Sequence, residues 1–160
     1  MDSLIIFGAK YLVAVPFLVL VLYFILAKTE VKYRLVWMSV FGMAFAYALA
    51  RIAGDLYNNP RPFVAGHFKP LIEHAADNGF PSDHTLFAAT VAAIVFYFNK
   101  RMGLVLWVVA LLISASRVAA GVHHAIDTVA SMAIAIVAVL ASHFLVRIIR
   151  KEHAAAEPKE

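Results

Sequence analysis

Two short strings of polar residues carry the chemistry that this sequence can perform. The first is Pro-Ser-Asp-His at residues 81–84, and the second starts at Ser116 and Arg117 and continues to His123 and Asp127. Imidazole, carboxylate, guanidinium and hydroxyl groups together can bind a phosphate and attack it. Nearly all of the surrounding sequence is apolar, and ionisable residues in or beside membrane segments are costly and usually functional. We therefore interpret the two strings as a site for phosphate chemistry.

The composition is typical of an integral membrane protein. The chain has 160 residues, of which 63% are hydrophobic and only 15% are charged, far from the balance of soluble domains. At this length we expect one domain over residues 1–150, followed by a charged cytoplasmic tail at 151–160. The absence of cysteine excludes thiol and disulfide chemistry. We attribute the formal charge of +4 to membrane topology and anion binding, and expect no nucleic-acid partner.

Long apolar runs predict an all-α bundle of about five transmembrane helices. The third run reaches a spanning length only if it begins near Pro81, because a helix needs about 20 residues to cross the hydrocarbon. Residues 2–10 either extend the first helix or form an extra interfacial helix. No signal-peptide cleavage pattern follows the first run, so we expect it to remain as an anchor. The five runs cover residues 11–27, 35–53, 84–98, 102–120 and 126–147.

The basic residues predict the orientation of the bundle. Most of them lie in the connections 28–34 and 99–101 and after residue 146, which five crossings place on one side of the membrane. The positive-inside rule assigns that side to the cytoplasm. We therefore expect a multi-pass protein of the bacterial inner membrane, with its N-terminus outside and its C-terminus in the cytoplasm. The two polar strings then face the periplasm.

The polar residues fall at helix ends that share one membrane face. The long loop 54–80 also belongs to that face, and two prolines fix its turn around Arg61. Within this loop we expect one or two helical turns at Pro70–Ala76. The antiparallel order of the runs brings the following residues to that face: Arg51, Arg61, Ser82, His84, Ser116, Arg117, His123 and Asp127.

Each of these residues also has a structural interpretation. Ser82 after Pro81 is an ordinary helix start, and Asp127 four residues after His123 is an ordinary local pair. Arginines at helix ends often reach toward lipid headgroups. Taken together, these interpretations require several coincidences on one face, so we favour a functional site. His124 stays open, whereas four histidines have no partner pattern and are interpreted as structural or solvated: His67, His74, His143 and His153.

These residues resemble the motifs of the type 2 phosphatidic acid phosphatase superfamily, a family of membrane lipid phosphatases. Its motifs are Lys-x6-Arg-Pro, Pro-Ser-Gly-His and Ser-Arg-x5-His-x3-Asp, and the third matches fully here. The second has Asp83 where the family commonly has glycine. The first matches at Arg61 and Pro62, but Gly54 occupies the lysine position and Arg51 is the nearest basic residue upstream. The resemblance implies the helical core that the family shares with acid phosphatases and vanadium haloperoxidases.

The resemblance also implies a mechanism. His123 would attack phosphorus to give a phosphohistidine, and Asp127 would hold its other ring nitrogen in the required tautomer. His84 would protonate the leaving oxygen and then act as a base on water. No metal or cofactor is implied, because arginine supplies the positive charge. Phosphate binding is implied for Arg61, Arg117, Ser82 and Ser116, and for Arg51 in place of the missing lysine.

Within the superfamily, the chain is most similar to the bacitracin-resistance type of undecaprenyl pyrophosphate phosphatase. The similarity rests on Pro-Ser-Asp-His and on Asn-Pro-Arg-Pro-Phe-Val at 59–64. It implies hydrolysis of a polyprenyl diphosphate to the monophosphate and inorganic phosphate, which recycles the cell-wall carrier lipid. The alternatives are a phosphatidylglycerophosphate, phosphatidate or lipid A phosphatase, a lipid phosphotransferase, and a membrane protein without enzymatic activity. The expected partners are an isoprenoid or glycerolipid phosphate and membrane lipids.

Overall fold

A computed structural model describes residues 1–156 of the chain, with side chains up to residue 149. All regular elements in this part are helices, which confirms the predicted all-α fold. Residues 157–160 of the predicted tail lie outside the described residues, and the last helix continues through the first part of that tail. The helices are α1 (Asp2–Lys10), α2 (Ala14–Leu26), α3 (Thr29–Leu56), α4 (Pro62–Ala65), α5 (Asp83–Phe98), α6 (Lys100–Ala119) and α7 (Ala125–Ala156).

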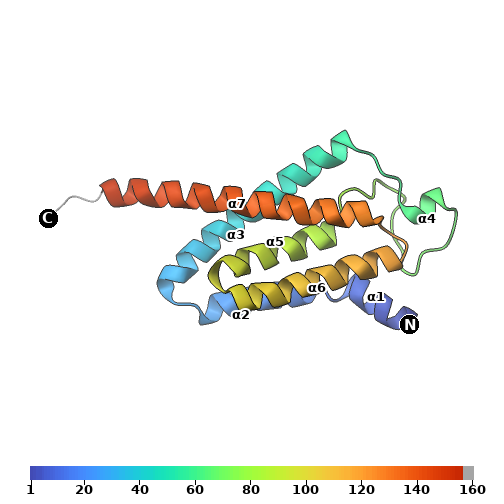
Figure 1. The fold of residues 1–160 in the computed structure, drawn as a ribbon, viewed down its shortest axis with the longest axis horizontal. Coiled ribbons are helices and arrows are strands. Elements are labelled where there is room, and N and C mark those ends of the chain that lie inside the picture. Colours follow the sequence, from blue (N-terminus) through green and yellow to red (C-terminus); the bar gives the residue numbers. More distant parts are fainter. Residues whose placement is uncertain (157–160) are drawn as a thin grey trace.

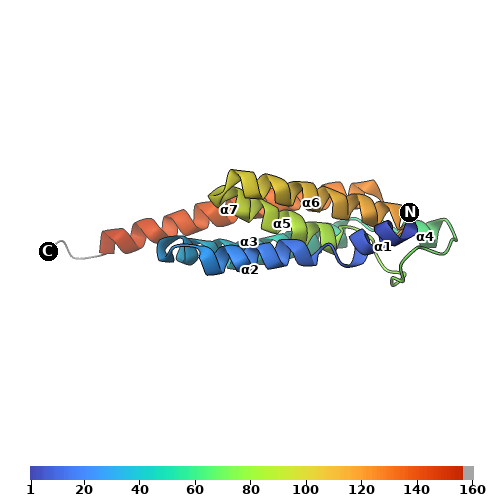
Figure 2. The same cartoon turned by 90° about the horizontal axis from the view of Figure 1, so that it is seen from below.

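The helices form an elongated bundle whose two ends differ in structure (Figure 1). The N-terminus, α4, the long loop and the α6–α7 turn lie together at one end. The α2–α3 and α5–α6 turns lie at the other end, where α7 projects beyond the bundle (Figure 2). This arrangement places the predicted polar helix ends together and separates them from the basic connections.

Helix α5 lies at the centre and packs against α2, α3, α6 and α7. Its buried residues point in all directions around the helix, as expected for a helix that is covered on every side. Many of them are small, which allows neighbouring helices to approach closely. The buried residues of α5 are Thr85, Leu86, Ala88, Ala89, Thr90, Val91, Ala92, Ile94 and Val95.

Three helices, α3, α6 and α7, are each long and apolar enough to cross a membrane. The pair α1 and α2 forms a fourth candidate span, bent by 44° at the break between its two helices. Pro16 explains the break, because its ring lacks an N–H and would clash with the carbonyl of Leu12 in a continuous helix. Helix α5 has only 16 residues and connects the long loop at one end of the bundle to α6 at the other. The predicted number of about five crossings is therefore approximate.

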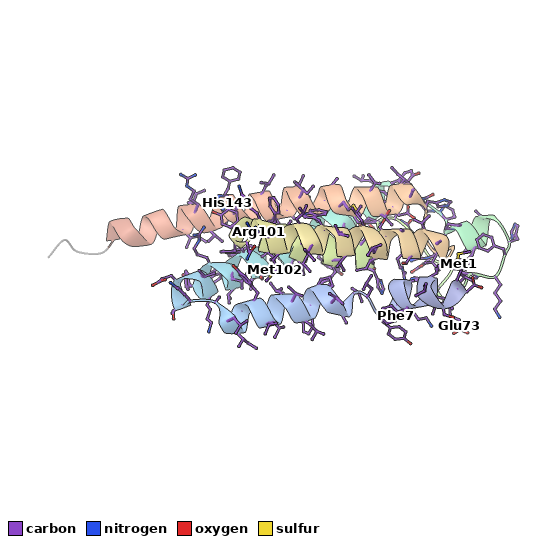
Figure 3. All side chains as sticks on the ribbon, turned by 60° about the horizontal axis from the view of Figure 1, so that its bottom comes forward. Met1, Phe7, Glu73, Arg101, Met102 and His143 are labelled. Carbon is purple, nitrogen blue, oxygen red and sulfur yellow. The ribbon has the colours of Figure 1, made fainter. Side chains whose placement is uncertain are left out.

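The outer faces of the long helices are covered with exposed apolar side chains, as expected for contact with lipid. Figure 3 shows these side chains around the whole bundle, with Met1, Phe7 and Glu73 toward the loop end and Arg101 and His143 toward the opposite end. The chain is a membrane-embedded protein on this evidence. Examples on α6 and α7 are Leu104, Val108, Leu111, Leu112, Val129, Val137, Leu140 and Phe144.

The helical turns predicted at Pro70–Ala76 are wrong. This segment is irregular, and the short helix of the loop is α4, with Pro62 in its first turn. The backbone N–H of Leu71 donates to the carbonyl of Ala120 at 3.0 Å, and Ile72 is buried in a cluster with Ala120. Tertiary contacts with the α6–α7 turn, and not a local helix, therefore hold this segment in place.

Candidate active site

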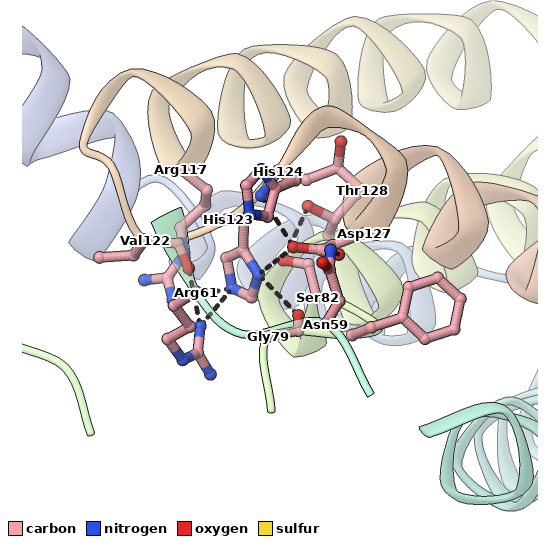
Figure 4. Close-up of polar contacts among 12 residues, drawn as sticks. Asn59, Arg61, Gly79, Ser82, Arg117, Val122, His123, His124, Asp127 and Thr128 are labelled. Carbon is pink, nitrogen blue, oxygen red and sulfur yellow. Dashed lines mark hydrogen bonds and ion pairs between the residues drawn. The ribbon is translucent and has the colours of Figure 1, made fainter. Parts of the chain in front are cut away.

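His123 lies in the turn between α6 and α7 and is almost fully buried, with 2% of its surface exposed. Its Nε2 atom lies 3.2 Å from a terminal nitrogen of Arg61 and 3.3 Å from one of Arg117. Its Nδ1 atom lies 2.9 Å from the carbonyl oxygen of Gly79 (Figure 4). Arginine only donates and a carbonyl only accepts. The ring is therefore protonated on Nδ1 and carries its lone pair on Nε2, between the two guanidinium groups.

The surroundings of His123 keep its ring neutral. Burial, followed by the positive charges of Arg117 and Arg61, lowers the pKa of His123 from 6.5 to about 3. A neutral imidazole with a free Nε2 lone pair is the nucleophilic form. The two guanidinium groups that lower its pKa are hydrogen-bond donors of the kind that bind phosphate oxygens.

Asp127 belongs to the first turn of α7 and is fully buried. One carboxylate oxygen accepts a hydrogen bond of 2.6 Å from the Asn59 side chain, and the other accepts one of 2.8 Å from the backbone N–H of His124. The second oxygen is also 3.4 Å from Nδ1 of His123. Gly79 is thus the nearer acceptor for the Nδ1 proton, and Asp127 adds a negative charge beside the same nitrogen.

Arg61 is held from several directions. Its Nε donates to Asp77 at 2.8 Å, and its terminal nitrogens donate to the carbonyls of Val122 at 2.9 Å and Asn78 at 3.4 Å. Although partial burial acts in the opposite direction, the hydrogen bond and charge of Arg61 lower the pKa of the Asp77 carboxyl. Asp77 is therefore an anion at neutral pH and orients the guanidinium toward His123.

Arg117 occupies the last turn of α6 and is 3% exposed. One terminal nitrogen donates to the carbonyl of Ala9 in α1 at 3.3 Å, and the other faces His123. Its Nε has no hydrogen-bond partner among the described residues. A buried guanidinium with an unused donor and no bonded carboxylate is expensive unless an anion binds it. This feature favours a phosphate ligand.

Asn78 joins the parts of the loop that carry Arg61 and Gly79. Its side-chain nitrogen donates to the carbonyls of Gly54 and Tyr57, at 3.0 and 3.1 Å. Its side-chain oxygen accepts from the backbone N–H groups of Asn59 and Phe80, at 2.9 and 3.0 Å. These bonds hold the end of α3 and two loop segments in one arrangement. Neither Asn78 nor Asn59 is among the predicted site residues, although Asn59 begins the string at 59–64 and Asn78 precedes glycine in a typical turn pair.

The structure also places the remaining residues of the predicted site. His84, in the first turn of α5, is partly buried, and the charges of Arg117, His74 and Arg61 act on it. Ser82 is fully buried at the N-cap position of α5. Its hydroxyl accepts a hydrogen bond of 3.2 Å from Thr85 and makes no capping bond. His84 therefore belongs to the electropositive site, whereas the Ser82 hydroxyl is engaged within α5.

Ser116 does not take part in the hydrogen bonds around His123 that the structure describes. It lies against Gly8 of α1, so closely that a side chain on Gly8 would collide with the Ser116 hydroxyl. This contact brings α1 next to the last turn of α6. The neighbouring Ala9 carbonyl then reaches Arg117. The observed position of Ser116 indicates helix packing and gives no support to the predicted phosphate contact.

Arg51 and Gly54 define the departure from the first motif. Gly54 lies on the last turns of α3, and a Cβ atom there would be 3.0 Å from the carbonyl oxygen of Phe80. Arg51 is exposed and lines a cavity of about 290 Å³ beside the site, together with Arg61 and Asp83. The close approach of the loop explains why glycine fits at position 54. With glycine at position 54, Arg51 is the basic residue of α3 that lines the same cavity as Arg61.

His74 is a further neighbour of His123 that we interpreted as structural or solvated from the sequence. The two rings meet edge to face, with centroids 6.1 Å apart and an interplanar angle of 76°. His74 and Asp77 lie in an irregular loop without hydrophobic periodicity. Only the folded loop brings them to the site.

The site consists mainly of positive charge and hydrogen-bond donors around a neutral imidazole. Among the described residues, no group of three histidine, cysteine or acidic side chains is arranged to hold a metal ion. The two guanidinium groups facing Nε2 of His123 suit an anion.

The chain is similar to several known proteins. A family model described as the PAP2 superfamily matches residues 35–151. The chain is 30% identical over 141 residues to the bacitracin transport permease protein BcrC of Bacillus licheniformis, covering 88% of this chain and 69% of that protein. It is 31% identical over 137 residues to the undecaprenyl-diphosphatase BcrC of Bacillus subtilis, covering 86% and 70%. The crystal structure of Aquifex aeolicus LpxE superposes with a TM-score of 0.67 and 25% identity, covering 88% of this chain and 81% of that one.

Proposed function

The chain belongs to the PAP2 superfamily, and on this premise we propose that it hydrolyses undecaprenyl diphosphate, or a related polyprenyl diphosphate, to the monophosphate and inorganic phosphate. The family and the relatives support lipid phosphatase activity. The observation that carries the proposal is the Nε2 lone pair of His123, which lies between Arg61 and Arg117 in a buried site. The name of the Bacillus subtilis relative, undecaprenyl-diphosphatase, supports the choice of a diphosphate substrate.

In the first step, the terminal phosphoryl group binds Arg61 and Arg117, and Nε2 of His123 attacks its phosphorus. The bond between phosphorus and the bridging oxygen breaks, and the lipid monophosphate leaves with its electrons. His84 supplies a proton to this oxygen. The ring of His123 then carries a positive charge, which the Gly79 carbonyl and the Asp127 carboxylate stabilise next to Nδ1. Because both arginines are already in place, little reorganisation is needed.

In the second step, water replaces the histidine on phosphorus. His84, which has lost its proton, takes one from the water while the water oxygen forms the new bond to phosphorus. The bond between Nε2 of His123 and phosphorus breaks, and inorganic phosphate leaves. The negative charge of the bound diphosphate favours the protonated form of His84 that the first step needs, and the departure of the lipid monophosphate favours the neutral form that the second step needs.

The orientation of the bundle belongs to the same proposal. The described basic residues Lys28, Lys32, Lys100 and Arg101 lie at the end opposite the site. The positive-inside rule would then place the site on the periplasmic face of the inner membrane. Cysteines introduced at exposed Ala65 and at exposed Arg101 test this, because the natural sequence has none. An impermeant thiol reagent added to intact cells should label only Ala65→Cys, and the opposite pattern would reverse the orientation.

Phosphate release from purified protein tests the reaction. The substrates are undecaprenyl diphosphate, phosphatidylglycerophosphate and phosphatidate, each in EDTA, with His123→Ala as the inactive variant. His143→Asn is the matched control, because His143 lies toward the opposite end of the bundle (Figure 3). We expect the wild type and the control, but not His123→Ala, to release phosphate from the diphosphate, and to do so faster than from either glycerolipid. Release from the glycerolipids alone would exclude the proposed substrate, and full activity of His123→Ala would exclude the nucleophile.

A further inference from the structure

His74 is placed at the site but has no part in the mechanism above. Its side chain reaches from the irregular loop to the ring of His123, and 24% of that side chain is exposed. Its Nδ1 lies 3.4 Å from the carbonyl of Ala75 and 3.9 Å from the carboxylate of Asp77. Among the described residues, its Nε2 has no hydrogen-bond partner. His74 thus presents an unused imidazole nitrogen at the edge of the site.

The charges around His74 are predominantly positive. Burial, followed by the charges of Arg61 and Arg117, lowers the pKa of its ring, and only Asp77 among the nearby side chains acts in the opposite direction. The other ionisable groups facing this region are His84 and His123. In the free protein, His74 is therefore neutral. A strongly anionic ligand that neutralises the arginines would favour its protonated form, in which both ring nitrogens donate.

We propose that His74 binds the phosphoryl group of a diphosphate substrate that is not transferred. This inference rests on the proposed function, since it assigns a second phosphate to the same site. Arg61, Arg117 and His123 surround the transferred group. The other phosphoryl group then lies beside this trio, and the partly exposed ring of His74, whose centroid is 6.1 Å from that of His123, is close enough to contact it. A monophosphate ester has only an uncharged chain at this position, so His74 would select diphosphates over monophosphates.

The test compares farnesyl diphosphate with farnesyl monophosphate, which share the same chain. The variants are His74→Asn, which removes the ionisable group, and His74→Lys, which retains a cation. His67→Asn is the control, because His67 is an exposed histidine of the same loop with a φ of 51°, a backbone conformation that asparagine tolerates. His74→Asn should lower kcat/KM for the diphosphate about 10- to 100-fold, which corresponds to the free energy that one hydrogen bond to a charged group contributes. It should change the monophosphate value by less than about 3-fold, and His74→Lys should keep the preference.

A second measurement uses inhibition by methylenediphosphonate and by methylphosphonate, neither of which is hydrolysed. The wild type should bind the diphosphonate more tightly, and His74→Asn should lose that preference. An equal loss of activity on both substrates would overturn the inference and assign His74 to the positioning of His123. Unchanged kinetics of His74→Asn, or equal inhibition of the wild type by both phosphonates, would also overturn it. Failure of the proposed function would give a different result, because the wild type would then release no phosphate from undecaprenyl diphosphate or from farnesyl diphosphate.

Discussion

Replacing Asp127 with asparagine exchanges one carboxylate oxygen for an NH₂ group in a place where every neighbour donates. The side chain of Asn59 donates to one oxygen at 2.6 Å, and the backbone of His124 donates to the other at 2.8 Å. Whichever way the new amide turns, its NH₂ group faces an N–H. One buried donor therefore loses its acceptor, and His123 loses the negative charge beside Nδ1.

The expected losses differ in size for stability and for catalysis. An unsatisfied buried donor costs about 1–3 kcal/mol, which for a chain of this length lowers the melting temperature by about 2–12 °C. Loss of the carboxylate that orients a catalytic histidine costs up to about 10⁴-fold in kcat in a known Asp–His pair. Because Gly79 still holds Nδ1 at 2.9 Å here, we expect a loss of about 10²- to 10³-fold.

A double substitution separates the two effects. In Asn59→Asp with Asp127→Asn, the new amide donates to the new carboxylate and still accepts from the His124 N–H. The melting temperature in detergent should return to within about 2 °C of the wild-type value, while kcat remains low because the charge has moved away from His123. Thermal unfolding and phosphate release are measured on the wild type, Asp127→Asn and the double variant. A double variant as unstable as Asp127→Asn would refute the hydrogen-bond argument, and a fully active Asp127→Asn would refute the catalytic one.

Three further predictions follow from particular contacts. The pKa of His123 falls from 6.5 to about 3 on folding, so between these pH values the unfolded chain binds a proton that the folded chain does not. The free energy of unfolding should therefore decrease as the pH falls from 6.5 toward 3, and it should decrease less in His123→Asn. Urea titrations at pH 7 and pH 5 would measure this difference. Gly54→Lys restores the lysine of the family motif, but it should lower the melting temperature without raising kcat, because the Cβ atom of the new lysine would lie 3.0 Å from the Phe80 carbonyl oxygen. A higher kcat in this variant would contradict the prediction. Gly8→Ala should lower kcat more than Ser116→Ala, because the added methyl group displaces α1 from α6. Adding Ser116→Gly to Gly8→Ala should partly restore activity. Equal phosphate release by all of these variants would rule out this packing argument.

The arrangement of the helices could be predicted because each helix carries its own signal. Apolar runs and their polar ends are local features of the sequence, and alternating crossings place those ends on one face. The same argument predicts that Arg61, Arg117, His123 and Asp127 lie together, as they do in the structure. Helix α5 is shorter than the length expected for a span, and neighbouring helices cover it on every side.

The supporting residues of the site could not be predicted in this way. His74, Asp77 and Asn78 lie in an irregular loop, where no periodic pattern distinguishes a side chain that faces the site from one in solvent. Ser116 is the converse case. It belongs to a motif, but its position is determined by a contact with Gly8, which is remote in the sequence. Sequence patterns identified the groups suited to the chemistry, whereas tertiary contacts decide which of them face the ligand.

The bond between Arg117 and the Ala9 carbonyl has a consequence for how the protein is made. The two residues are 108 positions apart, so the Ala9 carbonyl gains this donor only after the ribosome has made α6, long after α1. Arg61 likewise depends on the carbonyl of Val122, 61 positions later. A partly inserted chain therefore has no assembled anion site. Phosphatase activity should appear only when α6 and the turn after it have joined the bundle, so that incomplete chains in the membrane are inactive.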